Sequence, residues 1–402
     1  MPRPVTGVCG LSPGHFIPRM RPSFARRPER VVGIPVAREN LRFAAVMPSA
    51  RFQENVRPGP NFMGSPYLLA CAPVTSSDAV AAGDGHGRAM RPVTPSDFPA
   101  LARLMNEINA GTGLLLVHSP EEVAEDLTLP YVDLATDAVC IEEDGEIVGH
   151  AHTYFVDSAE RELRCYVFGG VHPSVRERGI GSRLVAWGVG RARELVAANP
   201  HGLPVAIRAE TAAGDTASEM LLADNGFVPV RWFNDLHRTL DDLPPVREAD
   251  GFTVAPWDAS RHEELRGVKN AAFRDHWGST PTSAAGWGQM TSGFGARTDL
   301  SFMALDAGGR VIGLVLSHRY PGDDEVIGGR YGWIDKVATL ADWRGRGVAR
   351  TLITHTMAAY AREGLTHAAL NVDTDNPTGA FGLYSGLGFV PFRGAVNHQL
   401  LG

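Results

Sequence analysis

Two short stretches decide the fold of this chain: Arg344-Gly345-Arg346-Gly347-Val348-Ala349 and Arg176-Glu177-Arg178-Gly179-Ile180-Gly181. Each stretch follows an apolar, strand-like run and opens a segment with the apolar period of an amphipathic helix. A glycine turn at the start of a helix presents free backbone N–H groups, and such groups bind a pyrophosphate. The arginines add positive charge beside them. Both stretches therefore predict a site for a phosphate-bearing cofactor.

The repetition extends to the ends of both halves of the chain. Residues 225–230 read Asn-Gly-Phe-Val-Pro-Val, and residues 387–392 read Leu-Gly-Phe-Val-Pro-Phe. Repetition over this length indicates a duplicated domain. We expect a first domain at 90–240, a linker at 241–250 and a second domain at 251–402.

Composition places most of the chain among folded globular proteins. The chain has 402 residues, of which 44% are hydrophobic and 21% charged, so two domains and a tail fit its length. Residues 1–89 scatter Pro, Gly, Arg and Ser without a period, which predicts a disordered extension. That extension carries eleven Arg and five Asp or Glu, a net charge of about +6. Because the whole chain has a net charge of −7, residues 90–402 carry about −13. An acidic folded part disfavours a nucleic-acid partner.

The cysteines and the apolar runs indicate the cellular compartment of the protein. The four cysteines have no C-x-x-C spacing, so we expect no metal site and a reducing cytoplasm. No apolar run reaches the roughly 18 residues of a membrane span, so we expect no membrane partner. The Arg-rich, acid-poor start also resembles an organellar presequence.

The expected elements follow the same order in both halves. In the first half a strand at 91–93 precedes a helix capped by Ser96, a helix starts at Pro120, and Asp144-Gly145 predicts a hairpin. In the second half the stretch between the first two helical segments is rich in Trp and Gly, and we expect a loop there. Each glycine turn follows the fourth strand, which is not the place of a Rossmann turn, and no P-loop Lys-Ser/Thr is present. NAD and ATP are therefore disfavoured.

The end of the second half carries a resemblance. Asn376-Pro377, Leu383-Tyr384 and Gly388-Phe389 follow the second glycine turn. Together these motifs resemble the GNAT superfamily of acetyl-CoA-dependent N-acetyltransferases, over about residues 90–400 in two copies. The resemblance implies an α/β fold in tandem. Each copy would have a mixed, mainly antiparallel sheet flanked by helices, with a splay between the fourth and fifth strands.

The resemblance also implies roles for particular residues. Acetyl-CoA would bind through the backbone of the fourth strand, the glycine turns and the Asn-Pro segment. These residues are Val337, Ala338, Thr339, Arg344, Gly345, Arg346, Gly347, Val348, Ala349 and Asn376, with Arg176, Arg178, Gly179 and Gly181 in the first copy. Tyr384 would protonate the departing thiolate. A carboxylate would deprotonate the amine, and Asp335 and Asp373 are the candidates. Asp335 also suits an ion pair with Lys336, and Asp373 a turn cap.

The two copies are not equivalent. Alignment on the Gly-Phe motifs places Leu222 opposite Tyr384, and counting back from the glycine turns places Val167 opposite Asp335. The first copy lacks the acid and the base. We therefore expect the second copy to catalyse while the first binds CoA silently or supports the fold.

The acceptor is the least constrained part of the interpretation. In the family, the region that here contains His276, Trp277 and Trp287 forms much of the acceptor wall, which suits a polar amine with an apolar body. The tryptophans also suit a loop pinned to the core. The tandem arrangement resembles the mycothiol synthases, which acetylate the cysteinyl amine of a pseudodisaccharide thiol. The alternative acceptors are other small-molecule amines and a peptide N-terminus. The alternative function is a non-catalytic CoA-binding scaffold. We expect a monomer or a homodimer.

Overall fold

The computed structural model describes residues 88–401, apart from 115, 130, 157–159, 201, 247–249 and 376–378. The disorder expected for residues 1–89 lies almost wholly outside the described residues and stays a prediction, as do the domain limits. The first half contains β1 (Ala89–Pro92), α2 (Phe98–Thr112), α3 (Pro120–Leu127), α4 (Leu134–Asp137), β2 (Ala138–Glu143), β3 (Glu146–Val156), β4 (Leu163–Val171), α5 (Ile180–Ala198), β5 (Val205–Ala212), α6 (Thr216–Asp224) and β6 (Phe227–Thr239).

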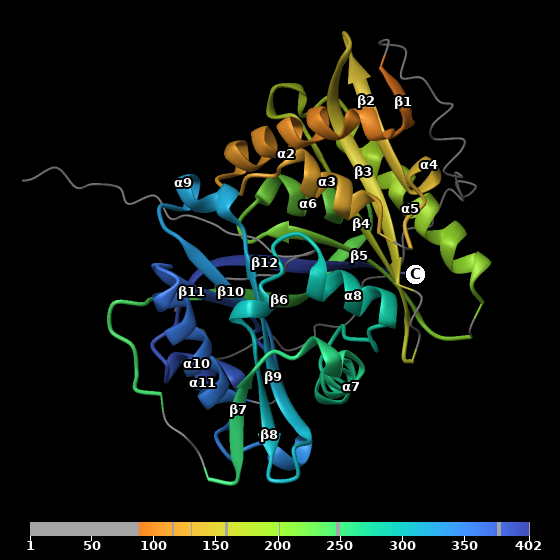
Figure 1. The fold of residues 1–402 in the computed structure, drawn as a ribbon. Coiled ribbons are helices and arrows are strands. Elements are labelled where there is room, and N and C mark those ends of the chain that lie inside the picture. The colour runs from red at the N-terminus through yellow and green to blue at the C-terminus, as the bar shows by residue number, and fades with distance from the viewer. Residues whose placement is uncertain are drawn as a thin grey trace, which may run out of the picture. The chain divides into compact units, whose positions relative to one another are not determined.

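The second half repeats the order of strands and longer helices, except that the short α4 precedes β2 while the short α9 follows β9 (Figure 1). It contains β7 (Phe252–Pro256), α7 (His262–Ala272), α8 (Ala284–Ser292), β8 (Phe302–Asp306), β9 (Val311–Arg319), α9 (Asp324–Ile327), β10 (Tyr331–Thr339), α10 (Val348–Arg362), β11 (His367–Asp373), α11 (Ala380–Ser385) and β12 (Val390–Leu400).

Local signals account for most of these elements, with two corrections. Ser119 caps α3 by accepting from Glu122 N, and Asp144 and Gly145 form the expected hairpin with φ of 54° and 84°. Ser96 is not the cap of the first helix. A short 3-10 turn precedes that helix, and Thr94 and Asp97 form its capping box. The Trp- and Gly-rich stretch is also not all loop, because Ser283 caps α8 within it.

The twelve strands form one sheet in the order β1-β2-β3-β4-β5-β12-β6-β11-β10-β9-β8-β7. The last strand of each half therefore leaves its own half. β12 pairs antiparallel with β5, and β6 pairs antiparallel with β11, while β6 and β12 also pair with each other. Each half therefore completes the sheet of the other. The limits 90–240 and 251–402 describe the two sequence repeats, and as domain limits they remain a proposal.

The fourth and fifth strands of each half diverge, as expected for the fold class. β4 pairs with β5 only from Leu163↔Val205 to Tyr166↔Arg208, and β10 pairs with β11 only from Tyr331↔His367 to Ile334↔Leu370. Beyond these pairs the strands continue without facing each other. The divergence opens the sheet next to each glycine turn.

Helices cover the second half of the sheet on both sides. Figure 1 shows α10 and α7 on opposite sides of β9 and β10, and each packs into a separate apolar cluster. Tyr360 of α10 is fully buried and donates to Trp333 O at 2.7 Å. Only a glycine fits beneath this ring, because a Cβ at Gly332 would lie 2.4 Å from Tyr360 Cε2. The close approach fixes α10, and with it the second glycine turn.

A buried polar group joins the two exchanged strands. Asp235 of β6 is 1% exposed and forms an ion pair with Arg393 of β12. Asn371 of β11 donates to Asp235 Oδ1 at 2.9 Å. Burial, with the nearby charge of Asp235, raises the pKa of Glu210 on β5 well above its usual value. These contacts fix the register where the halves meet.

We expect Arg393→Met to lower the free energy of unfolding by about 3 kcal/mol, because it leaves the buried Asp235 without its ion pair. Urea unfolding followed by circular dichroism measures this loss. Arg310→Met removes an exposed partner of Asp306 and should cost no more than about 1 kcal/mol. Equal losses for the two variants would contradict a structural role for the buried pair.

Candidate active site

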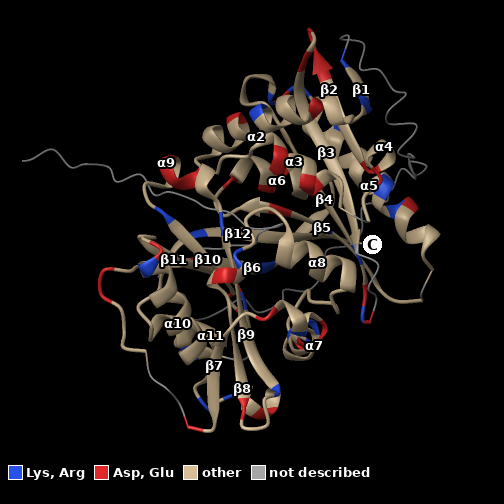
Figure 2. Ribbon diagram, in the orientation of Figure 1, with Lys and Arg blue, Asp and Glu red and all other residues tan. Residues whose placement is uncertain are grey.

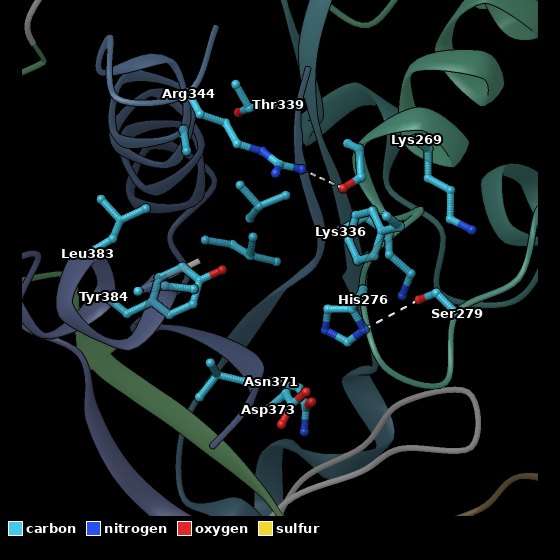
Figure 3. Close-up of a pocket in the computed structure, with 18 of the residues that line it drawn as sticks. Lys269, His276, Ser279, Lys336, Thr339, Arg344, Asn371, Asp373, Leu383 and Tyr384 are labelled. Carbon is cyan, nitrogen blue, oxygen red and sulfur yellow. Dashed lines mark hydrogen bonds between the residues drawn. The ribbon is translucent and has the colours of Figure 1, made fainter. Parts of the chain in front are cut away.

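The second glycine turn has the backbone that an anion site needs. Gly345 and Gly347 adopt φ of 73° and 86°, and Gly347 is the N-cap of the fifteen-residue helix α10. The N–H groups of the first turn of α10 have no partner within the helix, and the positive end of the helix dipole lies there. Arg344 reaches across to donate to Ala272 O at 2.8 Å (Figure 3). The turn is therefore tied to the end of α7.

The first glycine turn keeps this backbone with a different side chain. Gly179 adopts φ of 79° as the N-cap of α5, and Glu177 adopts φ of 62° where the second copy has Gly345. A non-glycine residue at such a φ is uncommon. Arg178 pairs with Glu143 at 3.5 Å, and Arg176 donates to Val171 O at 3.4 Å. The first turn thus retains its conformation but carries a carboxylate and engages its arginines elsewhere.

A cavity of about 630 Å³ lies in the second half, at the divergence of β10 from β11. This volume is typical of a small-molecule site. Of the residues predicted from the sequence, Asp335, Val337, Thr339, Arg344, Gly345, Gly347, Val348, Ala349, Asp373, Tyr384, His276 and Trp277 line it. Ala338, Arg346 and Trp287 do not, the residues of the first turn lie in the other half, and Asn376 is outside the described residues.

Tyr384 faces this cavity from α11 (Figure 3). Its ring is 8% exposed and contacts the edge of Phe389, with ring centroids 6.3 Å apart. Burial raises its pKa to about 12, so the hydroxyl keeps its proton throughout the neutral range. A neutral tyrosine in a cavity can donate a proton to a departing group.

The two predicted carboxylate bases are both paired with cations. Arg231 holds both oxygens of Asp373 at 2.9 Å, and Asp373 also accepts from Asp375 N, as a turn cap does. Asp335 lies at a bulge in β10 and pairs with Lys336 Nζ at 2.6 Å. The bulge lets both Asp335 and Lys336 line the cavity. Both carboxylates are therefore already engaged by a cation.

His276 offers a proton acceptor on the opposite wall. Its Nδ1 lies 2.8 Å from Trp277 O, and a carbonyl oxygen only accepts, so Nδ1 carries the hydrogen. The lone pair is then on Nε2, and Figure 3 shows that side of the ring turned toward Tyr384. Burial lowers the pKa of His276, which favours the neutral ring.

The two predicted acceptor tryptophans have different environments. Trp277 lines the cavity beneath the guanidinium of Arg208, 4.3 Å from the ring centroid. Trp287 is fully buried, donates to His262 O at 3.1 Å and packs near Trp257. Trp287 therefore belongs to the core, and we no longer assign it to the acceptor wall.

The sequence motifs missed the contribution of the first half to this cavity. Tyr166 of β4 and Phe233 of β6 line it, and three arginines of the first half reach the loop at 273–282, which we call the acceptor loop. Arg161 donates to Arg274 O, Arg164 donates to Thr280 Oγ1 at 2.8 Å, and Arg208 covers Trp277. No motif marks these residues, because their positions depend on the strand exchange.

The acetyltransferase (GNAT) family matches residues 111–227 and 263–389. The chain belongs to the GNAT family of acetyltransferases. The two matches confirm the tandem arrangement, and each includes one glycine turn. In the described part of the chain, no helix is long and apolar enough to cross a membrane.

Two curated relatives are 29% and 31% identical to this chain over the aligned residues. The mycothiol acetyltransferase of Tsukamurella paurometabola is 31% identical over 235 residues, which are 54% of this chain and 72% of the relative. That of Pseudarthrobacter chlorophenolicus is 29% identical over 226 residues, 54% of this chain and 65% of the relative. The chain thus spans slightly less than two thirds of the latter.

Solved structures share the fold. A GCN5-related N-acetyltransferase from Sphaerobacter thermophilus is 28% identical with a TM-score of 0.62, covering 78% of this chain and 95% of that one. A tandem GNAT protein from the clavulanic acid biosynthesis pathway is 15% identical with a TM-score of 0.58, covering 78% and 98%. The second likeness concerns the fold alone.

We expect the His276 ring to be neutral at pH 6.5 with its hydrogen on Nδ1, because burial lowers its pKa and Trp277 O accepts that hydrogen. Nitrogen-15 NMR of the histidine rings reports both the charge and the tautomer, and His276→Gln assigns the signal. A charged ring at pH 6.5, or a hydrogen on Nε2, would rule out the proton-acceptor role.

Proposed function

We propose that the second half binds acetyl-CoA and transfers its acetyl group to the amine of a small molecule. The observation that carries this proposal is the convergence of the second glycine turn, the divergent strands and Tyr384 on one cavity. The family supports acetyl as the acyl group. The walls supplied by Trp277 and Phe273 suit an acceptor with an apolar body.

The pyrophosphate of acetyl-CoA would bind at the second glycine turn. Among the residues that the structure describes, no atom other than those of adjoining residues lies within 4 Å of a Cβ built at Gly345 or Gly347, so the backbone there is open to a ligand. Arg344, Arg346 and Arg350 supply positive charge around the start of α10. Helix dipole, free N–H groups and guanidinium groups act together on the same anion.

The pantetheine arm would lie along β10. The ladder between β10 and β11 ends at Ile334, while β10 continues to Thr339 with β9 on its other side. The edge at Val337, Ala338 and Thr339 is thus available to an extended amide chain, which would pair with it like an added strand. This path leads from the glycine turn to Tyr384 and His276.

The chemistry that follows is direct attack of the amine on the thioester. The neutral amine nitrogen bonds to the acetyl carbon and gives up one of its protons to His276 Nε2. The carbon–sulfur bond breaks, and Tyr384 donates its proton to the CoA thiolate. Asp335 remains the second candidate for the base, through a water. Asp373 holds Arg231, and through it supports Trp277.

The first half would then support catalysis without performing it. Leu222, at the place of Tyr384, is buried and has no hydroxyl, and Val167 stands at the place of Asp335. A mycothiol-like acceptor is the second candidate, because the curated relatives are named mycothiol acetyltransferases. A non-catalytic scaffold would bind acetyl-CoA without releasing thiol in response to any amine.

We expect Tyr384→Phe to lower kcat by about 100-fold, because the thiolate loses its proton donor, with little change in acetyl-CoA affinity. Acceptor-dependent release of CoA thiol measures kcat. Tyr331→Phe removes a hydroxyl from another buried tyrosine, outside this cavity, and serves as the matched control. Full activity of Tyr384→Phe would refute its role as the acid.

We expect Gly347→Asp to abolish acetyl-CoA binding and Gly179→Asp to leave it unchanged, because each variant places a carboxylate in one glycine turn. The two glycines have similar φ, 86° and 79°, so the backbone strain is matched. Calorimetric titration of the full chain with acetyl-CoA measures both. Loss of binding only in Gly179→Asp would reverse the assignment of the two halves.

A further inference from the structure

Lysine occurs at only two positions in this chain, and both line the candidate cavity. They are Lys269 of α7 and Lys336 of β10. Lys336 is paired with Asp335, so its charge is largely balanced. Lys269 has a different environment, and its charge is the unusual feature of this site.

Lys269 is buried among neutral partners. It is 5% exposed, and its Nζ donates to Thr282 Oγ1 and to Asn270 Oδ1, the latter at 3.4 Å. The ring of Phe273 lies 5.7 Å from Nζ. Within the described part of the chain, Lys269 has no carboxylate at ion-pair distance. A buried ammonium with only neutral partners is destabilising unless a ligand compensates it.

Further cations lie on the same side of the cavity. Arg164 and Arg208 are 4% and 2% exposed, and the carboxylate that both of them pair with is Glu162. Together with Lys269 they form what we call the cationic cluster. A Cβ on Gly278 of the acceptor loop would lie 3.7 Å from Arg164 Nη1 and 4.0 Å from Arg208 Nη1. The two arginines therefore lie against this loop.

The charge of Lys269 persists at neutral pH. Burial, and then the charges of Lys336 and Arg164, lower its pKa to about 8, while Asp335 opposes them. At pH 7 most of the amine is therefore protonated. The chain as a whole has a net charge of −7, and Figure 2 shows acidic residues on α3 and α9. The positive character of the cavity is thus local.

We propose that Lys269 binds an oxyanion of the acceptor, so that the acceptor is an amine that also carries a carboxylate or a phosphate. This inference rests on the proposed function. Figure 3 shows Lys269 on the side of Ser279, across the cavity from Tyr384, with Lys336 and His276 between them. An acceptor with its amine near His276 and Tyr384 would extend its acidic group toward Lys269. The ion pair formed there would select charged acceptors over neutral ones of the same shape.

The test compares acceptors that differ only in the charged group. Calorimetry on the full chain with CoA bound measures binding of L-amino acids against their carboxamides, and of O-phosphoethanolamine against ethanolamine. The first pair tests a carboxylate and the second a phosphate. We expect the charged member of at least one pair to bind 10-fold or more tightly, from a charge-assisted hydrogen bond.

Variants then assign the preference to Lys269. Lys269→Met should reduce the preference to near 1, and Lys269→Arg should restore part of it. Arg310→Met removes an exposed charge away from the cavity and should change nothing. An unchanged acetyl-CoA affinity in Lys269→Met shows that the variant is folded. Equal binding of charged and neutral members, no binding of any member, or a preference that survives Lys269→Met would overturn the inference.

Failure of the proposed function gives a different result. In that case the full chain would not bind acetyl-CoA, or no amine in the panel would release CoA thiol. Both are measured separately from the binding preference. A charged acceptor that binds through Lys269 without thiol release would thus support the oxyanion site while refuting catalysis.

Discussion

The exchange of the last strands constrains everything else in this structure. β12 of the second half completes the sheet of the first, and β6 of the first completes that of the second. The buried pair of Asp235 and Arg393 fixes the register at this junction, where a slip of one residue would move a charge into an apolar layer. The position of each divergent strand pair, and so of each glycine turn, follows from that register.

The exchange also explains how two unequal copies form one site. β6 brings Phe233 and Arg231 beside the acceptor loop, and β4 and β5 bring Arg164 and Arg208 behind it. The first half, which has Leu222 and Val167 at the aligned positions, thus supplies part of the wall of this cavity. This accounts for the burial of Arg164 and Arg208 in a half that has no counterpart of Tyr384 or Asp335.

The sequence predicted what local chemistry determines. The glycine turns, the helix start at Pro120 and the hairpin at Asp144-Gly145 are encoded within short windows, and the structure contains them. The tandem family is confirmed by the two family matches. The strand exchange is not encoded locally, since β12 and β5 have the same apolar pattern whichever half they join. The sequence therefore missed the residues that act across the junction. It also placed Trp287 at the site, because a tryptophan in the core and one in a cavity wall look alike in a sequence.

The exchange has a consequence for how the chain is made. Thr211 of β5 and His398 of β12 contact each other across 187 residues of sequence, and β12 ends at Leu400. During synthesis the second edge of β5 has no partner until β12 has been made, and an open strand edge invites pairing with other chains. A chain that stopped before β12 would contain both glycine turns but would leave the sheet of the first half incomplete.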